Sequence, residues 1–188
     1  MPEIYLLATN TKKPISHMIT AYTGERFNHA SVAFDRSLAE CYSYSMAENG
    51  FVRETKETWP GWTTFELYAA QVTSAGFARA RELVRDLSRE RPDFSYRGVL
   101  GVAVGIPIES DEALFCSQFV EKVCIEAGLP RMFPDAALAT PLRACARKGA
   151  RLVAKGLMHE QLIVAQKGRT SSIFSEGLDP EIYDWRHT

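Results

Sequence analysis

The sequence predicts a single α+β domain, in which an antiparallel sheet formed by the first 72 residues is followed by helices. Three observations support this prediction. Short segments rich in β-branched and aromatic residues alternate with turn residues in that first part, and later stretches repeat apolar residues at helical spacing. In addition, 46% of the 188 residues are hydrophobic, which fills one core well and is short for two full domains.

The strand signals come first in the chain. Residues 3–8 form a short apolar run typical of a buried strand. Residues 29–34 and 40–45 flank a turn and predict a β-hairpin, whose second strand is rich in aromatic residues. Further strand signals lie at residues 51–54, 64–68 and 70–72.

Helical spacing is clearest at residues 74–90 and is also present at 13–22. A further helix is expected to begin near Cys116 and to end at Gly128, with an apolar inner face. The apolar stretch 98–106 is expected only to pack or to loop. The rest of the chain predicts a short helix at 141–147, a strand at 162–165, and a division into a domain of residues 1–167 and a polar C-terminal tail of residues 168–188.

Charge and hydropathy exclude several classes of partner. The 22 basic and 23 acidic side chains give a net charge of -1 without a long run of like charge, so a nucleic-acid partner is not expected. The amino-terminal apolar run is too short for a signal peptide, and no stretch reaches the roughly 20 apolar residues of a membrane span. We therefore expect a cytoplasmic protein with no transmembrane segment.

The cysteines lie far apart and form no CxxC pair: Cys41, Cys116, Cys124 and Cys145. This spacing signals neither a zinc knuckle nor a disulfide framework. Cys116 differs from the others in its expected place at a helix N-terminus, where free N–H groups and the helix dipole favour a thiolate and can stabilise an oxyanion. The alternative is that Cys116 is a small buried apolar residue, as we expect of the other three cysteines.

A thiol nucleophile needs a base, and His29 is the best placed of the four histidines because it lies at the mouth of a strand. His17 is expected on an exposed helix face, His159 follows a Gly-rich turn, and His187 lies in the tail. A third group should orient the imidazole. Of Glu40, Tyr42 and Ser43 on the returning strand of the hairpin, chemistry favours Glu40. Strand alternation places Tyr42 with Glu40 and Ser43 on the opposite face, so the choice depends on register.

Several of these segments together resemble a known family: NHASVAFD at residues 28–35, YSYS at 42–45, GFVRE at 50–54 and FCSQFV at 115–120. The pattern is similar to the permuted papain-like branch of the NlpC superfamily, which includes bacterial YiiX-type proteins and the lecithin:retinol acyltransferase-like enzymes. In that branch the catalytic histidine precedes the cysteine, as His29 precedes Cys116 here. The resemblance covers roughly residues 3–130.

The resemblance implies a circularly permuted papain-like fold, in which the helix bearing Cys116 packs against a small antiparallel sheet bearing His29. It also implies a third polar residue on the strand after the histidine strand, although the family's spacing leads to Cys41, so that residue stays open. The expected activity is that of a cysteine hydrolase or acyltransferase, with no metal or organic cofactor. Its expected substrate is a peptidoglycan-type peptide amide or a lipid acyl ester or amide. The alternative is a catalytically silent module that binds a peptide or acyl chain in the same cleft.

Overall fold

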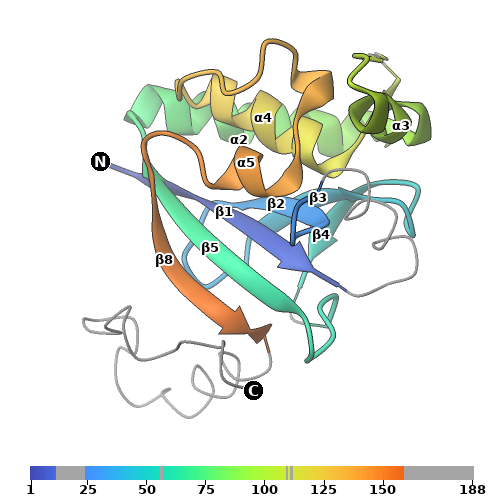
Figure 1. Ribbon diagram of the computed structural model, residues 1–188. Helices are drawn as coiled ribbons and strands as arrows, with labels where there is room; N and C mark the ends of the chain where they lie inside the picture. Colours follow the sequence, from blue (N-terminus) through green and yellow to red (C-terminus); the bar gives the residue numbers. More distant parts are fainter. Residues whose placement is uncertain (12–23, 56, 109, 111, 159–188) are drawn as a thin grey trace.

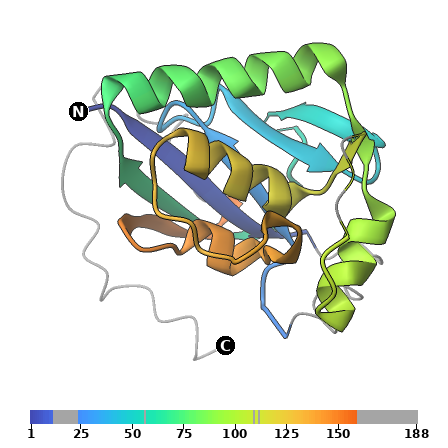
Figure 2. The same ribbon diagram turned by 90° about the horizontal axis from the view of Figure 1, so that it is seen from above.

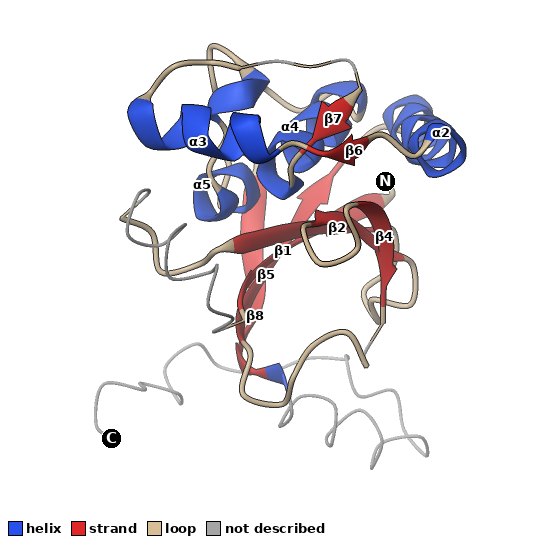
Figure 3. Ribbon diagram, turned by 90° about the vertical axis from the view of Figure 1, so that its right-hand side faces the viewer, coloured by secondary structure: helices blue, strands red, loops and turns tan. Residues whose placement is uncertain are grey.

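The computed structural model describes residues 1–11, 24–55, 57–108, 110 and 112–158 of the chain. The described residues form eight strands: β1 (Glu3–Asn10), β2 (His29–Ala33), β3 (Cys41–Ser45), β4 (Gly50–Glu54), β5 (Thr64–Gln71), β6 (Asp93–Phe94), β7 (Ala113–Leu114) and β8 (Ala150–Leu157). They join into one sheet in the order β7, β6, β4, β3, β2, β1, β5, β8. This sheet is curled (Figure 3).

The helices of the described residues are α2 (Ser74–Glu90), α3 (Tyr96–Val104), α4 (Cys116–Glu126) and α5 (Pro141–Cys145), together with the short 3-10 helix η1 (Ala136–Leu138). They gather on one side of the sheet (Figure 1). Seen from above, α4 crosses over the central strands, and α2 runs along the margin of the same layer (Figure 2). The predicted α+β class is therefore confirmed. None of the helices in the described part of the chain is long and apolar enough to cross a membrane.

The predicted β-hairpin is confirmed by the pairing of β2 with β3, in which Val32 lies opposite Tyr42 and Ala33 opposite Cys41. All neighbouring strands pair antiparallel except β6 and β7. The apolar run of β1 has a clear cause, because this strand is buried on both faces. Its even-numbered residues face the helices, whereas Tyr5 and Leu7 join a second apolar cluster on the other face of the sheet.

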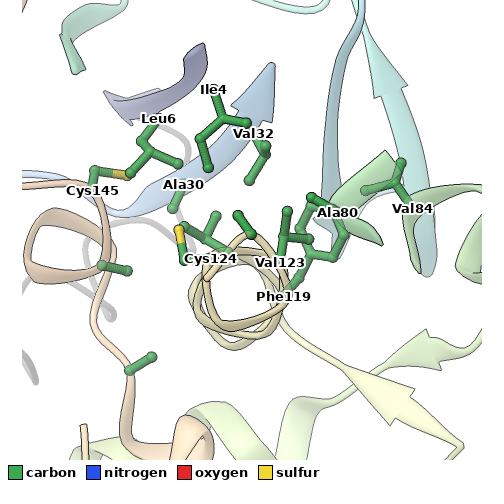
Figure 4. Close-up of a cluster of buried hydrophobic side chains, with 14 of the residues drawn as sticks. Ile4, Leu6, Ala30, Val32, Ala80, Val84, Phe119, Val123, Cys124 and Cys145 are labelled. Carbon is green, nitrogen blue, oxygen red and sulfur yellow. The ribbon is translucent and has the colours of Figure 1, made fainter. Parts of the chain in front are cut away.

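The main core lies between the sheet and α4. Phe119, Val120, Val123 and Cys124 are buried there, as predicted for the inner face of this helix. Figure 4 shows three of them, Phe119, Val123 and Cys124, gathered opposite Ile4, Leu6, Ala30 and Val32 of the sheet. This packing fixes α4 on the sheet, and with it the position of Cys116 at the first residue of the helix.

The structure differs from the sequence-based expectations in two described segments. Residues 98–106, expected to pack or loop, belong largely to helix α3, whose N-cap Ser95 accepts a 3.1 Å hydrogen bond from the backbone N–H of Gly98. Gly105 ends the helix with a positive φ of 70°. The second segment is β8, an edge strand whose residues are all exposed or partly buried, and so without the apolar alternation that reveals a strand.

Other predictions agree closely or fall on residues outside the described part. Helix α2 has the predicted bounds, and α4 ends two residues before Gly128, which has a φ of 84°. The predicted helix 13–22, the strand 162–165, the tail from residue 168, and the residues His17, His159 and His187 all lie outside the described residues.

Candidate active site

Cys116 occupies the N-terminus of α4. The residue before it, Phe115, is extended, with φ -122° and ψ 165°, and no side chain caps this helix end. The first N–H groups of an α-helix have no acceptor within the helix, so they point outward beside the thiol. Cys116 itself is 6% exposed. The local sequence therefore places a cysteine where free N–H groups and the positive end of the helix dipole are concentrated.

His29 begins β2 and lies between Cys116 and a carboxylate. Its Nε2 atom is 2.7 Å from Oε1 of Glu54, at the end of β4, and its side chain is 16% exposed. Its side chain is also hydrogen-bonded to Cys116. Since Nε2 faces Glu54, Nδ1 is the ring nitrogen left for the thiol. The histidine thus connects the N-terminus of α4 with the end of β4.

Asn28 fixes the start of β2 in front of this histidine. Its backbone N–H donates to the carbonyl of Thr9 at 3.0 Å, and its Nδ2 donates to Oδ1 of Asn10 at 2.8 Å. Asn28 is 3% exposed, so these hydrogen bonds are shielded from water. The end of β1 therefore holds the backbone of residue 28 and limits where the next side chain can point.

Strand alternation explains how Glu54 comes to face His29. His29, Ser31 and Ala33 share one face of β2. Ala33 lies opposite Cys41 of β3, and Cys41 lies opposite Glu54 of β4. Ala33 and Cys41 belong to the second apolar cluster, so Ser31 and Glu54 share that sheet face. His29 is the first residue of β2 and also lies beside Cys116 of α4. The carboxylate and the imidazole meet across β3, which lies between β2 and β4 in the curled sheet (Figure 3).

The Glu54 carboxylate is 2% exposed and has three partners. Oε1 faces His29, while Oε2 accepts a hydrogen bond from the hydroxyl of Ser31 and lies 3.9 Å from Sγ of Cys41. Burial raises the pKa of Glu54, but the charge and hydrogen bond of His29 and the hydrogen bonds from Ser31 and Cys41 outweigh it. The net effect is a pKa below the usual value. The carboxylate is therefore ionised at neutral pH.

The charge of Glu54 has the opposite effect on its partner. Burial lowers the pKa of His29, yet the charge of Glu54 and the hydrogen bonds to Cys116 and Glu54 raise it to about 10. The imidazole is therefore protonated at neutral pH, with the Glu54 carboxylate on one side of it and the sulfur of Cys116 on the other. Cys41, in contrast, has a pKa well above its ordinary value, because of burial and the charge of Glu54, and stays a neutral thiol.

The structure places Glu54, and not the predicted Glu40, against the histidine. Glu40 pairs with Arg81 of α2, at 2.9 Å between Oε2 and Nη2. The other two candidates are also engaged elsewhere: Tyr42 stacks on Phe51, and the Ser43 hydroxyl donates to the carbonyl of residue 30 at 2.6 Å. Glu54 lies on β4, one strand farther from β2 than the predicted candidates at residues 40–43. The overlooked signal is a carboxylate at the end of the strand 51–54.

The remaining cysteines are buried, as predicted. Cys41, Cys124 and Cys145 are each 0% exposed. Burial raises the pKa of Cys124 to about 12 and that of Cys145 well above its ordinary value. These thiols therefore stay protonated at neutral pH. Cys116 differs from them because the imidazole of His29 lies beside it.

Two further findings bear on the nature of the site. In the part of the chain that the structure describes, no group of three or more histidine, cysteine, aspartate or glutamate side chains is arranged to hold a metal ion. A scan against protein-family models finds no match for the chain, and a search of curated proteins finds none either.

Proposed function

We propose that this chain is a cysteine hydrolase or acyltransferase of the permuted papain-like kind. Cys116 is its nucleophile, His29 its general base and general acid, and Glu54 the residue that orients the imidazole. The observation that carries the proposal is the position of His29, which has Cys116 on one side and the Glu54 carboxylate, at 2.7 Å, on the other. A nucleophile, a base and an orienting carboxylate in this order are the parts of a catalytic triad.

In the first half of the reaction, the Cys116 proton resides on His29, and the thiolate attacks the substrate carbonyl carbon. A C–S bond forms, and the carbonyl electrons move onto oxygen. When this tetrahedral intermediate collapses, the bond to the leaving amine or alcohol breaks, and His29 gives that group its proton. The charge of Glu54 stabilises the imidazolium throughout.

In the second half, His29 accepts a proton from water or from another nucleophile, which attacks the thioester carbonyl carbon. When this second tetrahedral intermediate collapses, the C–S bond breaks and the Cys116 sulfur leaves as a thiolate beside the protonated His29. Water gives hydrolysis, and an acceptor amine or alcohol gives acyl transfer. The oxyanions of both halves face the N-terminus of α4, whose first N–H groups have no partner within the helix. Each such donor lowers a barrier of this type by roughly 3 kcal/mol.

The proposed substrate is an amide of a peptidoglycan-type peptide or an acyl ester or amide of a lipid. Both classes present a carbonyl that a thiolate can attack, and the resemblance to the NlpC superfamily includes both. The chemistry needs no metal or organic cofactor, because the thiol, the imidazole and the helix N-terminus supply the nucleophile, the proton transfer and the charge stabilisation.

A second candidate is a silent module of the same shape that binds a peptide or acyl chain. The low exposure of Cys116, 6%, favours this candidate, because a substrate carbonyl must reach the sulfur. The two candidates differ in the reactivity of the thiol, which is high in the first and ordinary in the second.

Alkylation by iodoacetamide from pH 4 to 9 separates them, with the modified cysteine located by mass spectrometry. We expect Cys116 to react rapidly at pH 6, where an ordinary thiol is almost fully protonated, and to be slowed at least tenfold in His29→Ala. Cys116→Ser is the control that shows which signal belongs to this residue. Reaction no faster than that of Cys124 or Cys145, and indifferent to His29→Ala, would favour the silent module.

A further inference from the structure

The second oxygen of Glu54 is held as closely as the first. Oε2 accepts a hydrogen bond from Ser31 Oγ, and Ser31 is 0% exposed. Ser31 stands two residues after His29 on the same face of β2, so one short strand supplies both the base and a donor to the group that orients it. The thiol of Cys41 lies 3.9 Å from this oxygen and is a much weaker donor.

We propose that Ser31 is a positioning residue, which keeps Glu54 ionised and turned so that Oε1 faces His29. The inference deepens the proposed function, since it concerns the same site, but it can be tested without any turnover. A buried carboxylate that accepts a hydrogen bond keeps its charge more easily, and one fixed at both oxygens cannot rotate away from its partner.

Of the described residues that contact Glu54 Oε2, Ser31 is the strongest hydrogen-bond donor. The titratable groups that face the carboxylate are His29 of β2 and Cys41 of β3, and Cys116 of α4 bonds to the histidine in turn. Asp35 acts on Cys41 by its charge. Oε2 has two donors, the hydroxyl of Ser31 and the weaker thiol of Cys41. Removal of the hydroxyl therefore leaves the buried charge of Glu54 poorly compensated and raises the pKa of this carboxylate.

The test is a titration of the Glu54 carboxyl carbon by ¹³C NMR in the intact protein, with the signal assigned through Glu54→Gln. In Ser31→Ala we expect the midpoint to rise by about one pH unit, since a lost hydrogen bond to a charged group has an effect of that size. Ser31→Thr retains the hydroxyl and restores the wild-type midpoint.

Ser43→Ala is the matched control. Ser43 is also a fully buried serine of the same sheet, but its hydroxyl donates to the carbonyl of Ala30. Both alanine variants lose one buried hydrogen bond, so a merely structural role predicts equal loss of stability and no shift of the Glu54 midpoint in either. If Ser31→Ala does not fold, Ser31→Cys replaces it, and the weaker thiol donor is expected to move the midpoint in the same direction.

The outcomes for Ser31 and for the proposed function are separable. An unchanged midpoint in Ser31→Ala, or an equal shift in Ser43→Ala, overturns the role of Ser31 whether or not Cys116 reacts with iodoacetamide. A shift confined to the Ser31 variants supports that role even if Cys116 proves unreactive, in which case only the hydrolase proposal fails.

Discussion

Two buried ion pairs hold this molecule together in different ways. Glu121 of α4 pairs with Arg147 at 3.0 Å, and both side chains are 0% exposed. Its other oxygen accepts a 2.9 Å hydrogen bond from the backbone N–H of Met132, while Arg147 donates to the carbonyl of Pro130. This pair fastens the loop after α4 to the helix. A guanidinium serves as a fixed cation and not as a proton-transferring base.

The pair of His29 and Glu54 has the same kind of contact but a partner that titrates. Histidine can take up and give up a proton near neutral pH, and the thiol of Cys116 lies beside His29. The two pairs share burial and charge pairing. They differ because His29 can titrate and has the thiol of Cys116 on the side opposite Glu54.

The largest expected effect comes from breaking the pair of Glu121 and Arg147. Arg147→Met leaves a buried carboxylate without its counter-charge and should lower the free energy of unfolding by about 3–5 kcal/mol, measured by urea denaturation. Alkylation of Cys116 in the folded fraction should keep its wild-type pH dependence. The double variant Glu121→Leu with Arg147→Met, which removes both charges, should recover much of the stability. A double variant as unstable as the single one would contradict this account.

The second effect is a loss of stability at alkaline pH, of at most about 4 kcal/mol between pH 6.5 and 10. The pKa of His29 is about 10 in the folded chain, against about 6.5 when unfolded. The raised pKa of His29 stabilises the folded chain. This contribution is fully present below pH 6.5 and is lost as the pH rises toward 10. The lowered pKa of Glu54 acts in the opposite direction and is lost as the pH falls below about 4.5.

Urea denaturation of wild type and of Glu54→Gln from pH 5 to 10 measures this effect. The variant removes the charge that raises the pKa of His29, so its stability should fall less between pH 6.5 and 10 than that of the wild type. Glu40→Gln is the control, since this carboxylate pairs with Arg81 at the surface and should leave the alkaline loss unchanged. Equal curves for wild type and Glu54→Gln would show that the pair does not raise the pKa of His29.

The smallest effect is expected at Cys41. Its thiol is a weak donor at 3.9 Å, and Glu54 retains Ser31 and His29 when the thiol is removed. Cys41→Ala should therefore lower the free energy of unfolding by about 1 kcal/mol, from lost packing, and leave the alkaline loss of the wild type intact. A change in that alkaline loss as large as in Glu54→Gln would make Cys41 an essential part of the pair.

Much of the architecture follows from local patterns. Helix α2 has a continuous amphipathic stripe and an N-cap at Thr73, and β2 and β3 flank a short turn, so their bounds can be predicted from the sequence. Strand β8 and helix α3 are harder. The first gains its structure from pairing with β5, and the second is apolar on more than one side, which hides its period.

The candidate site also contains two residues that local patterns reveal and one that they do not. Cys116 and His29 can be singled out because a helix N-terminus and the first residue of a strand are local features. Glu54 cannot be identified as the partner of His29 in this way, because the contact crosses β3 and depends on how strongly the sheet curls. Strand alternation gives the face on which a side chain lies, but not the curvature that brings two side chains together.

The order of the three groups along the chain bears on how the protein is made. His29 and Glu54 lie on strands of the first part of the chain, whereas Cys116 arrives with α4. During synthesis from the amino terminus, the base and its carboxylate leave the ribosome before the thiol does. The thiol meets its base only when α4 docks on the sheet. Under the proposed function, the nascent chain therefore lacks the pairing of thiol and base, and reactivity at Cys116 would mark a molecule that has finished folding.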